Sequence, residues 1–152
     1  FTIAADADPV AINKLYKKIR QEKITNLIPM IIDFTHPSPA VGLENKERTS
    51  FLERTGRRDL GLCLAFIHHL CIGKNIPLER VAEILAGSCL QLIIEFVPKE
   101  DEKTQSLLRS KEDLYPDYTA DKFEQAFNRY FTILQKRNIP GSVRTLYLMT
   151  RK

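Results

Sequence analysis

A chain of 152 residues, 43% of them hydrophobic, has the bulk of one globular domain, and we expect a single domain over residues 1–152. The 23 Lys and Arg residues only slightly outnumber the 19 Asp and Glu residues and are scattered, so charge does not argue for nucleic acid as a partner. No apolar run reaches the roughly 20 residues that cross a bilayer, so we expect no membrane segment.

Cysteine usage and the first residues give two further expectations. The cysteines are odd in number and two of them lie within or beside apolar runs, which is typical of reduced thiols in the cytoplasm. The chain opens on Phe1 inside an apolar, β-prone segment. Because proteins rarely begin within a core strand, we expect further residues to precede Phe1 in the intact protein.

Strands and helices alternate in the first half of the chain. The predicted elements are, in order, a strand at 1–5, a helix at 10–20, a strand at 27–32, a long loop at 34–59 with a short helix near 47–54, and a strand at 60–67. The first helix has the clearest start, because Asp8 can cap it and Pro9 can occupy its first position.

The second half continues the alternation and ends in two strands. The predicted elements are a helix at 77–86, a strand at 90–97, helices at 102–110 and 120–130 separated by a break at 113–119, and strands at 131–135 and 144–149. A turn around Pro140-Gly141-Ser142 joins the last two. Alternating strands and helices predict a mostly parallel α/β sheet, with an antiparallel hairpin at one edge.

Five features, in this order, resemble class I S-adenosylmethionine-dependent methyltransferases, and most closely their nodulation-related, methyltransferase-like group. They are Asp6 ending one strand, Asp33 ending the next, an apolar strand that leads into His68-His69-Leu70, the run Leu92-Ile93-Ile94-Glu95-Phe96-Val97-Pro98, and the terminal hairpin. The resemblance covers nearly the whole chain. It implies a Rossmann-like fold, S-adenosylmethionine as cofactor, and methyl transfer to an acceptor that the sequence does not identify.

The resemblance also assigns cofactor contacts. Asp6 matches the acidic residue that accepts hydrogen bonds from both ribose hydroxyls, and Asp33 matches the residue that accepts from the adenine amine. Phe34 is a candidate for stacking on the adenine. Ala65 and Phe66, together with Ile67, match the strand end that lines the methionine portion. Without the resemblance, these residues read as strand ends and ordinary core.

Catalytic and substrate roles rest on residue chemistry. His68 or His69 can act as a base, because imidazole titrates near neutral pH, although either can equally be structural. Glu95 lies in an apolar strand, so we expect it to have a partner or to point into the substrate pocket. Further substrate candidates lie in the long loop and in the break between two helices: Asn45, Arg48, Asp117 and Tyr118.

The sequence departs from the family at one place. The glycine-rich turn after the first strand of the fold is missing, and the six glycines here are isolated. Without that strand, its two neighbours lose a ladder partner. We therefore expect this chain alone to be inactive, unless a second copy or another chain completes the sheet.

Three other interpretations remain open at this point. The chain is a non-catalytic binding or assembly module on the same fold, or a nucleotide-binding dehydrogenase, which also carries an acidic residue after its second strand. Alternatively, Cys63, His68, His69 and Cys71 hold a metal, although their spacing lacks the Cys-x-x-Cys pairs of structural zinc sites. We expect no metal.

Overall fold

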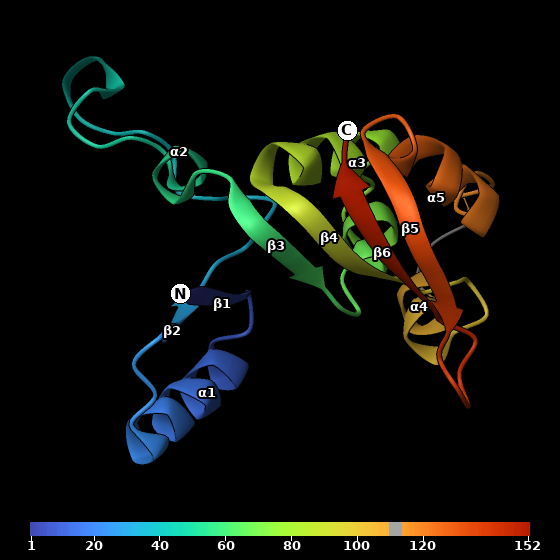
Figure 1. The fold of residues 1–152 in the computed structure, drawn as a ribbon, viewed down its shortest axis with the longest axis horizontal. Helices are drawn as coiled ribbons and strands as arrows, with labels where there is room; N and C mark the ends of the chain where they lie inside the picture. Colours follow the sequence, from blue (N-terminus) through green and yellow to red (C-terminus); the bar gives the residue numbers. More distant parts are fainter. Residues whose placement is uncertain (110–113) are drawn as a thin grey trace. The chain divides into compact units, whose positions relative to one another are not determined.

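The computed structural model describes residues 1–109 and 114–152, which divide into two compact units, Phe1–Arg54 and Thr55–Lys152 (Figure 1). Each unit contains one β-sheet, so the chain is a mixed α/β protein. The predicted single domain would combine both units and stays a prediction. The expected end of a helix at residue 110 and the start of the break at residue 113 lie outside the described residues.

The N-terminal unit contains a β-α-β motif. Strand β1 (Thr2–Asp6) and strand β2 (Leu27–Ile31) pair in parallel, and helix α1 (Pro9–Glu22) connects them. The Asp8 carboxylate accepts a hydrogen bond from the backbone N–H of Val10, and Pro9 opens the helix, as the sequence predicts. Helix α1 buries Ile12 and Ile19 and packs against both strands.

A long connection follows β2, as expected. Reciprocal backbone hydrogen bonds between Val41 and Arg48 close a small loop that contains the 3₁₀ turn η1 (Leu43–Asn45). Helix α2 (Phe51–Thr55) then begins later than the predicted residue 47. The reason is a capping box, in which the Glu53 carboxylate accepts from the N–H and hydroxyl of Ser50 and the Ser50 hydroxyl accepts from the N–H of Glu53.

The C-terminal unit is built on a four-stranded sheet in the order β3-β4-β6-β5. Its elements are β3 (Arg58–Cys63), the π-helix η2 (His69–Gly73), α3 (Leu78–Ser88), β4 (Cys89–Phe96), α4 (Glu102–Leu108), α5 (Ala120–Phe127), β5 (Phe131–Asn138) and β6 (Thr145–Arg151). Strands β3 and β4 are parallel, and β5 and β6 form an antiparallel hairpin. The predicted edge hairpin is therefore confirmed, since β5 is the outermost strand.

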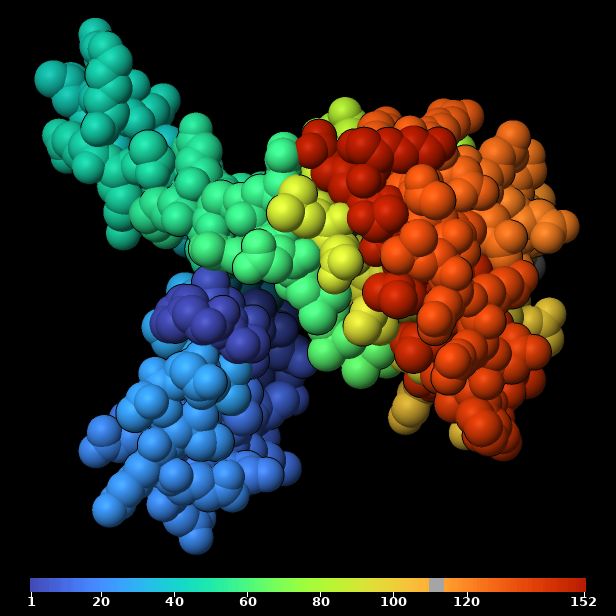
Figure 2. All heavy atoms as spheres, in the orientation of Figure 1, coloured from blue at the N-terminus to red at the C-terminus, as the bar shows by residue number. Residues whose placement is uncertain are grey.

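One face of this sheet is buried and the other reaches the surface. Helix α3 packs against β3 and β4 and contacts α5 (Figure 1). Ile94 and Tyr147 are paired on β4 and β6 and are fully buried, as is Phe123 of α5, whose ring centroid lies 5.0 Å from that of Tyr147. On the other face, side chains of β4, β5 and β6 are visible in Figure 2. Leu62 of β3 is 63% exposed there.

Most strand boundaries lie within one or two residues of the prediction, and two ends differ by more. Strand β3 ends at Cys63 rather than at residue 67, because the chain leaves the sheet in a turn at Ala65, whose φ is 48°. Strand β5 continues to Asn138 instead of residue 135, because Lys136 and Arg137 pair with β6 although both are polar. Within the described residues, β1 pairs only with β2 and β3 only with β4.

Candidate functional site

The carboxyl ends of β1 and β2 bring two acidic residues to one edge of the N-terminal sheet. Asp6 is the last residue of β1 and pairs with Ile31, the last residue of β2, while the Asp6 carbonyl accepts from the N–H of Ile32. Asp33 is the residue after Ile32, two positions beyond the end of β2. The two carboxylates predicted to bind one cofactor thus lie at neighbouring strand ends, as parallel pairing requires.

The Asp6 carboxylate keeps acceptor capacity for a ligand. Its Oδ1 accepts from the N–H of Asp8 at 2.8 Å, and the side chain is exposed. Its other oxygen has no hydrogen-bond partner in the part of the chain that the structure describes. Asp8, not Asp6, caps helix α1. An exposed carboxylate with a free oxygen suits a diol, which offers only hydroxyl donors to it.

Asp33 is more engaged than Asp6. Its Oδ1 accepts from the N–H and from the hydroxyl of Thr35, at 2.8 Å and 2.6 Å, and its Oδ2 lies 3.3 Å from Nδ1 of His36. These contacts fix the orientation of the carboxylate, whose side chain remains 40% exposed. Phe34 beside it is half-buried. The predicted roles of Asp33 and Phe34 at an adenine stay predictions.

In the C-terminal unit, the turn after β3 is held by Glu95 of β4. Oε2 of Glu95 accepts a short hydrogen bond from the backbone N–H of Ala65. Ala65 has a left-handed backbone, which costs a residue with a side chain about 1–2 kcal/mol. Such a conformation persists only where surrounding groups stabilise it. Here the Glu95 carboxylate does so by binding the N–H of Ala65.

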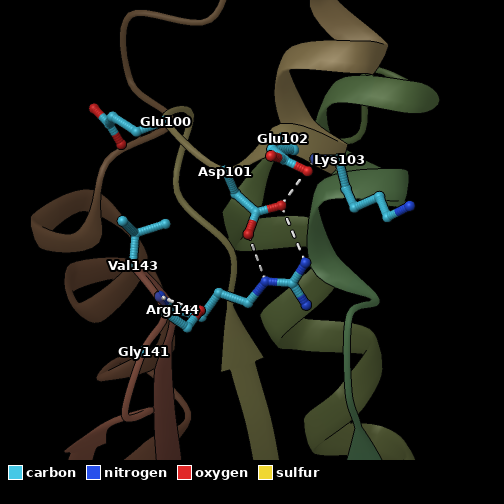
Figure 3. Close-up of a pocket in the computed structure, with 8 residues that line it drawn as sticks. Glu100, Asp101, Glu102, Lys103, Gly141, Val143 and Arg144 are labelled. Atoms are coloured by element: carbon cyan, nitrogen blue, oxygen red, sulfur yellow. Dashed lines mark hydrogen bonds and ion pairs between the residues drawn. The ribbon is translucent and has the colours of Figure 1, made fainter.

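Glu95 belongs to an ion-pair network centred on Arg144, and Figure 3 shows the part of it between Arg144 and Asp101. Nη1 of Arg144 lies 3.2 Å from Oε1 of Glu95, and the same guanidinium donates to Asp101 at 2.6 Å and 3.0 Å. The side chains of Glu95 and Asp101 are 8% and 10% exposed. The hydrogen bonds from Arg144 lower the pKa of Asp101, and hydrogen bonds to the two carboxylates raise the pKa of Arg144, so Asp101 and Arg144 both stay charged.

The network borders a hollow on the surface. This hollow of about 340 Å³ is lined by the segment before α4, the first turn of α4 and the hairpin turn: Glu100, Asp101, Glu102, Lys103, Gly141, Ser142, Val143 and Arg144. Figure 3 shows the Arg144 guanidinium facing the Asp101 carboxylate within it. Both oxygens of Glu95 are engaged inside the protein, by the N–H of Ala65 and by Arg144, so Glu95 has the partner that the sequence predicts. Its predicted role at a substrate stays a prediction.

The histidine pair follows the same turn. His68 is fully buried, and neither ring nitrogen has a hydrogen-bond partner among the described residues. Burial, and then the neighbouring charges of His69 and Arg144, lower the pKa of His68 to about 4. His68 is therefore neutral at neutral pH, which removes the titration argument for a base at this position. His69 is exposed, with its ring centroid 4.2 Å from that of His68.

The remaining candidate residues lie in separate places. Asn45 and Arg48 are exposed in the small loop of the N-terminal unit. Tyr118 is buried in the C-terminal unit, where its hydroxyl donates to the carbonyl of Val97 at 2.9 Å and its ring lies 5.3 Å from that of Phe96. These contacts give Tyr118 a structural role. Asp117 precedes it in the turn before α5.

The thiols and a metal site can be assessed from burial and geometry. Burial raises the pKa of Cys63 and of Cys71 to about 12, so both are protonated at neutral pH. Within residues 1–109 and 114–152, no group of three or more His, Cys, Asp or Glu side chains is placed to hold a metal ion. The four residues considered for a metal therefore do not form such a group.

Sequence reasoning missed Asp101 and Arg144. Asp101 carries a helix-capping signal, and its Oδ1 does accept from the N–H of Lys103 at 2.9 Å. Arg144 directly precedes β6 and has no distinguishing local pattern. A separation of 43 residues hides their pairing, because only the return of the hairpin beside β4 brings them together.

No protein-family model matches the chain. A curated relative, the nodulation protein NoeA of Rhizobium meliloti (strain 1021), is 38% identical over 149 residues, or 98% of this chain. The chain spans 31% of the length of that relative.

Solved structures share the fold. The crystal structure of WbdD at 2.2 Å matches 97% of this chain and 30% of its own, with a TM-score of 0.60 and 13% identity. WbdD is described as a bifunctional kinase-methyltransferase. An rRNA methylase from Escherichia coli matches 99% of this chain and 57% of its own, with a TM-score of 0.53 and 13% identity. These likenesses establish that the fold is one found in methyltransferases.

Among the described residues, no helix is long and apolar enough to cross a membrane.

Proposed function

We propose that this chain supplies the cofactor-facing strand ends of an S-adenosylmethionine-dependent methyltransferase with a Rossmann-like sheet. The observation that carries the proposal is the exposed Asp6 carboxylate at the end of β1, which keeps one oxygen free beside the fixed carboxylate of Asp33. The fold shared with the bifunctional kinase-methyltransferase WbdD and with an rRNA methylase supports the same class.

We assign each residue of the proposed cofactor site a role from its side-chain chemistry. Asp6 accepts from the ribose hydroxyls, Asp33 accepts from the adenine amine, and Phe34 covers the adenine face. Ala65 and Phe66 contribute backbone and apolar contact to the methionine portion. When bound, S-adenosylmethionine supplies an electrophilic methyl group on a sulfonium, and the protein contributes mainly positioning of the acceptor nucleophile.

The acceptor is a nucleophilic oxygen, nitrogen or carbon whose identity the site leaves open. A base is needed only if the acceptor carries a proton at attack. Because His68 is neutral and buried, the exposed His69 is the better placed of the pair to meet an acceptor. We propose a cytoplasmic location on the evidence of three free thiols.

We further propose that this chain needs an additional strand to bind the cofactor tightly. Strands β1 and β3 each have one strand partner in the described part of the chain, and none of the six glycines lies in a glycine-rich turn. A strand followed by such a turn, from a longer polypeptide or from a second copy, would pair with these edges. Its glycine-rich backbone would cover the ribose and carboxypropyl groups of the cofactor.

Calorimetric titration with S-adenosylhomocysteine tests the proposal. We expect only weak binding to this chain, and tighter, saturable binding to a polypeptide extended upstream of Phe1 along its gene. In the extended polypeptide, Asp6→Asn should weaken binding by about 10-fold or more, since a charged acceptor of ribose is lost. Asp8→Asn is the matched control: it makes the same charge change two residues away and keeps a good helix cap.

The outcomes separate this function from the second candidate, a non-catalytic binding or assembly module. The lack of a glycine-rich turn in these residues favours that candidate. If the extended polypeptide also fails to bind S-adenosylhomocysteine, the methyltransferase proposal is wrong and the module is favoured. Tight binding to the present chain, abolished by Asp6→Asn, would show that no further strand is needed.

A further inference from the structure

We infer that Arg144 is a positioning residue, which acts through Glu95 to fix the turn at Ala65 and Phe66 that faces the cofactor. The inference rests on the proposed function for the identity of the ligand. Its structural part, the control of the turn by Arg144, stands on the contacts alone and can be tested without any ligand.

The first step is the link between Glu95 and the turn. The Glu95 carboxylate accepts from the N–H of Ala65, which follows β3 and has a φ of 48°. A hydrogen bond to a charged acceptor is stronger than one to a neutral acceptor. Since β3 and β4 are parallel neighbours with Cys63 paired to Ile94, the side chain of the next residue on β4 reaches the turn directly. Glu95 is therefore the anchor of this turn.

The second step is the link between Arg144 and the anchor. The Glu95 side chain is only 8% exposed, and a buried charged group is costly unless it is paired. Arg144 is that partner, with Nη1 at 3.2 Å from Oε1 of Glu95. Two more of its donors, on Nε and Nη2, are held by Asp101, so the guanidinium cannot swing away from Glu95 without breaking two further hydrogen bonds.

The third step is the fork geometry of arginine. Nε and Nη2 of Arg144 donate to the two oxygens of Asp101, while Nη1 donates to Glu95. A planar guanidinium can serve two carboxylates in this way, whereas a lysine ammonium is a point charge without the fixed fork. Replacement by lysine should therefore keep the charge and lose much of the positioning.

The consequence for the site is specific. Loss of the guanidinium frees the Glu95 carboxylate to turn towards solvent, and the N–H of Ala65 loses its acceptor. His68, three residues further on and near Arg144, would gain access to water. The turn would then sample other conformations, and the cofactor-facing backbone would no longer be preorganised.

Amide hydrogen exchange followed by NMR tests the structural part in the present chain. The variants are Arg144→Met and Arg144→Lys, and the control is Arg137→Met, an exposed residue of the same hairpin. We expect exchange of the Ala65 amide to be about 10-fold faster in Arg144→Met and intermediate in Arg144→Lys. The control should match the unchanged protein, and amides of the β4–β6 ladder should keep their protection in all variants.

Two results would overturn the inference. One is an unchanged Ala65 amide; the other is a rise in its exchange that only parallels the β4–β6 ladder, which would indicate general destabilisation. If Arg144→Met does not fold, Arg144→Lys carries the same comparison. Titration of the extended polypeptide with S-adenosylhomocysteine completes the test, with about 10-fold weaker binding expected for Arg144→Met. Should the unchanged protein not bind, the proposed function fails, while the Ala65 result still decides whether Arg144 positions the turn.

Discussion

Replacement of Glu95 by glutamine should destabilise the C-terminal unit far more than the same change at other glutamates. The carboxylate accepts from Arg144 with one oxygen and from the N–H of Ala65 with the other. Glutamine has one acceptor oxygen and an NH₂ group, so one of these two donors would face another donor inside the protein. An unsatisfied buried partner of a charged group costs about 2–3 kcal/mol, which is the loss we expect in the free energy of unfolding.

Two other glutamates of the same unit provide a graded comparison. Glu124 accepts from Lys136 and from the Tyr147 hydroxyl, but its side chain is 29% exposed, so Glu124→Gln should cost about 1 kcal/mol. Glu83 pairs with Arg80 and is 50% exposed, so Glu83→Gln should cost under about 0.5 kcal/mol. The three substitutions keep side-chain size and remove the same charge, so burial and partners are the main differences.

The assay is urea unfolding followed by tyrosine fluorescence. The chain has no tryptophan, and Tyr16 is the one tyrosine that lies outside the C-terminal unit, so the signal reports mainly on this unit. The reasoning is refuted if Glu95→Gln costs no more than Glu83→Gln. It is also refuted if Glu124→Gln is the most destabilising of the three. The loss of partners at a partly exposed side chain would then cost more than the loss of partners at a buried one.

Two further predictions concern pH and packing. The pKa of His68 is lowered to about 4 in the folded protein, so its neutral form contributes stability above the ordinary histidine pKa of about 6.5, and that contribution is lost as pH falls towards 4. Urea unfolding between pH 7 and pH 4 should show a loss of about 3 kcal/mol that is absent in His68→Gln; an equal loss in both would contradict the assignment. A Cβ at Gly61 would lie 2.9 Å from Sγ of the buried Cys89, so Gly61→Ala should cost about 1–3 kcal/mol in the same assay. Gly87→Ala in α3 meets nothing within 4 Å and should be neutral or stabilising; a similar cost for both substitutions would show that packing at Gly61 is not the cause.

The order of elements could be predicted because each carries a local signal. Asp8 and Pro9 begin α1 where the capping rules place its start, and the apolar residues Ile12 and Ile19 recur on its buried face. The terminal hairpin follows from a turn sequence between two β-rich runs. Such signals depend on neighbours in the chain, so they survive in a single sequence.

The turn after β3 could not be predicted, because an apolar run does not distinguish a strand from a buried turn. Ile67 is fully buried, yet it lies beyond the last residue of β3. Alanine rarely adopts a positive φ, and Ala65 does so here, where a carboxylate from β4 binds its N–H. The signal for this turn is therefore tertiary.

The candidate site was predictable only in part for the same reason. Asp6 and Asp33 could be found because strand ends are visible in sequence and parallel pairing brings them to one edge. The Glu95–Arg144–Asp101 network could not be found, because its members lie on β4, beside β6 and before α4. Only Glu95 attracted notice, as a charge within an apolar strand.

The central claim is that the carboxyl ends of the parallel strands bind S-adenosylmethionine. The most direct measurement is NMR chemical-shift mapping of this chain with S-adenosylhomocysteine at millimolar concentration, where weak binding is still visible. We predict shifts at the amides of Asp6, Asp33 and residues 65–67, and none in Asp6→Asn at the first two. Shifts confined to other residues, or no shifts in either this chain or the extended polypeptide, would contradict the account.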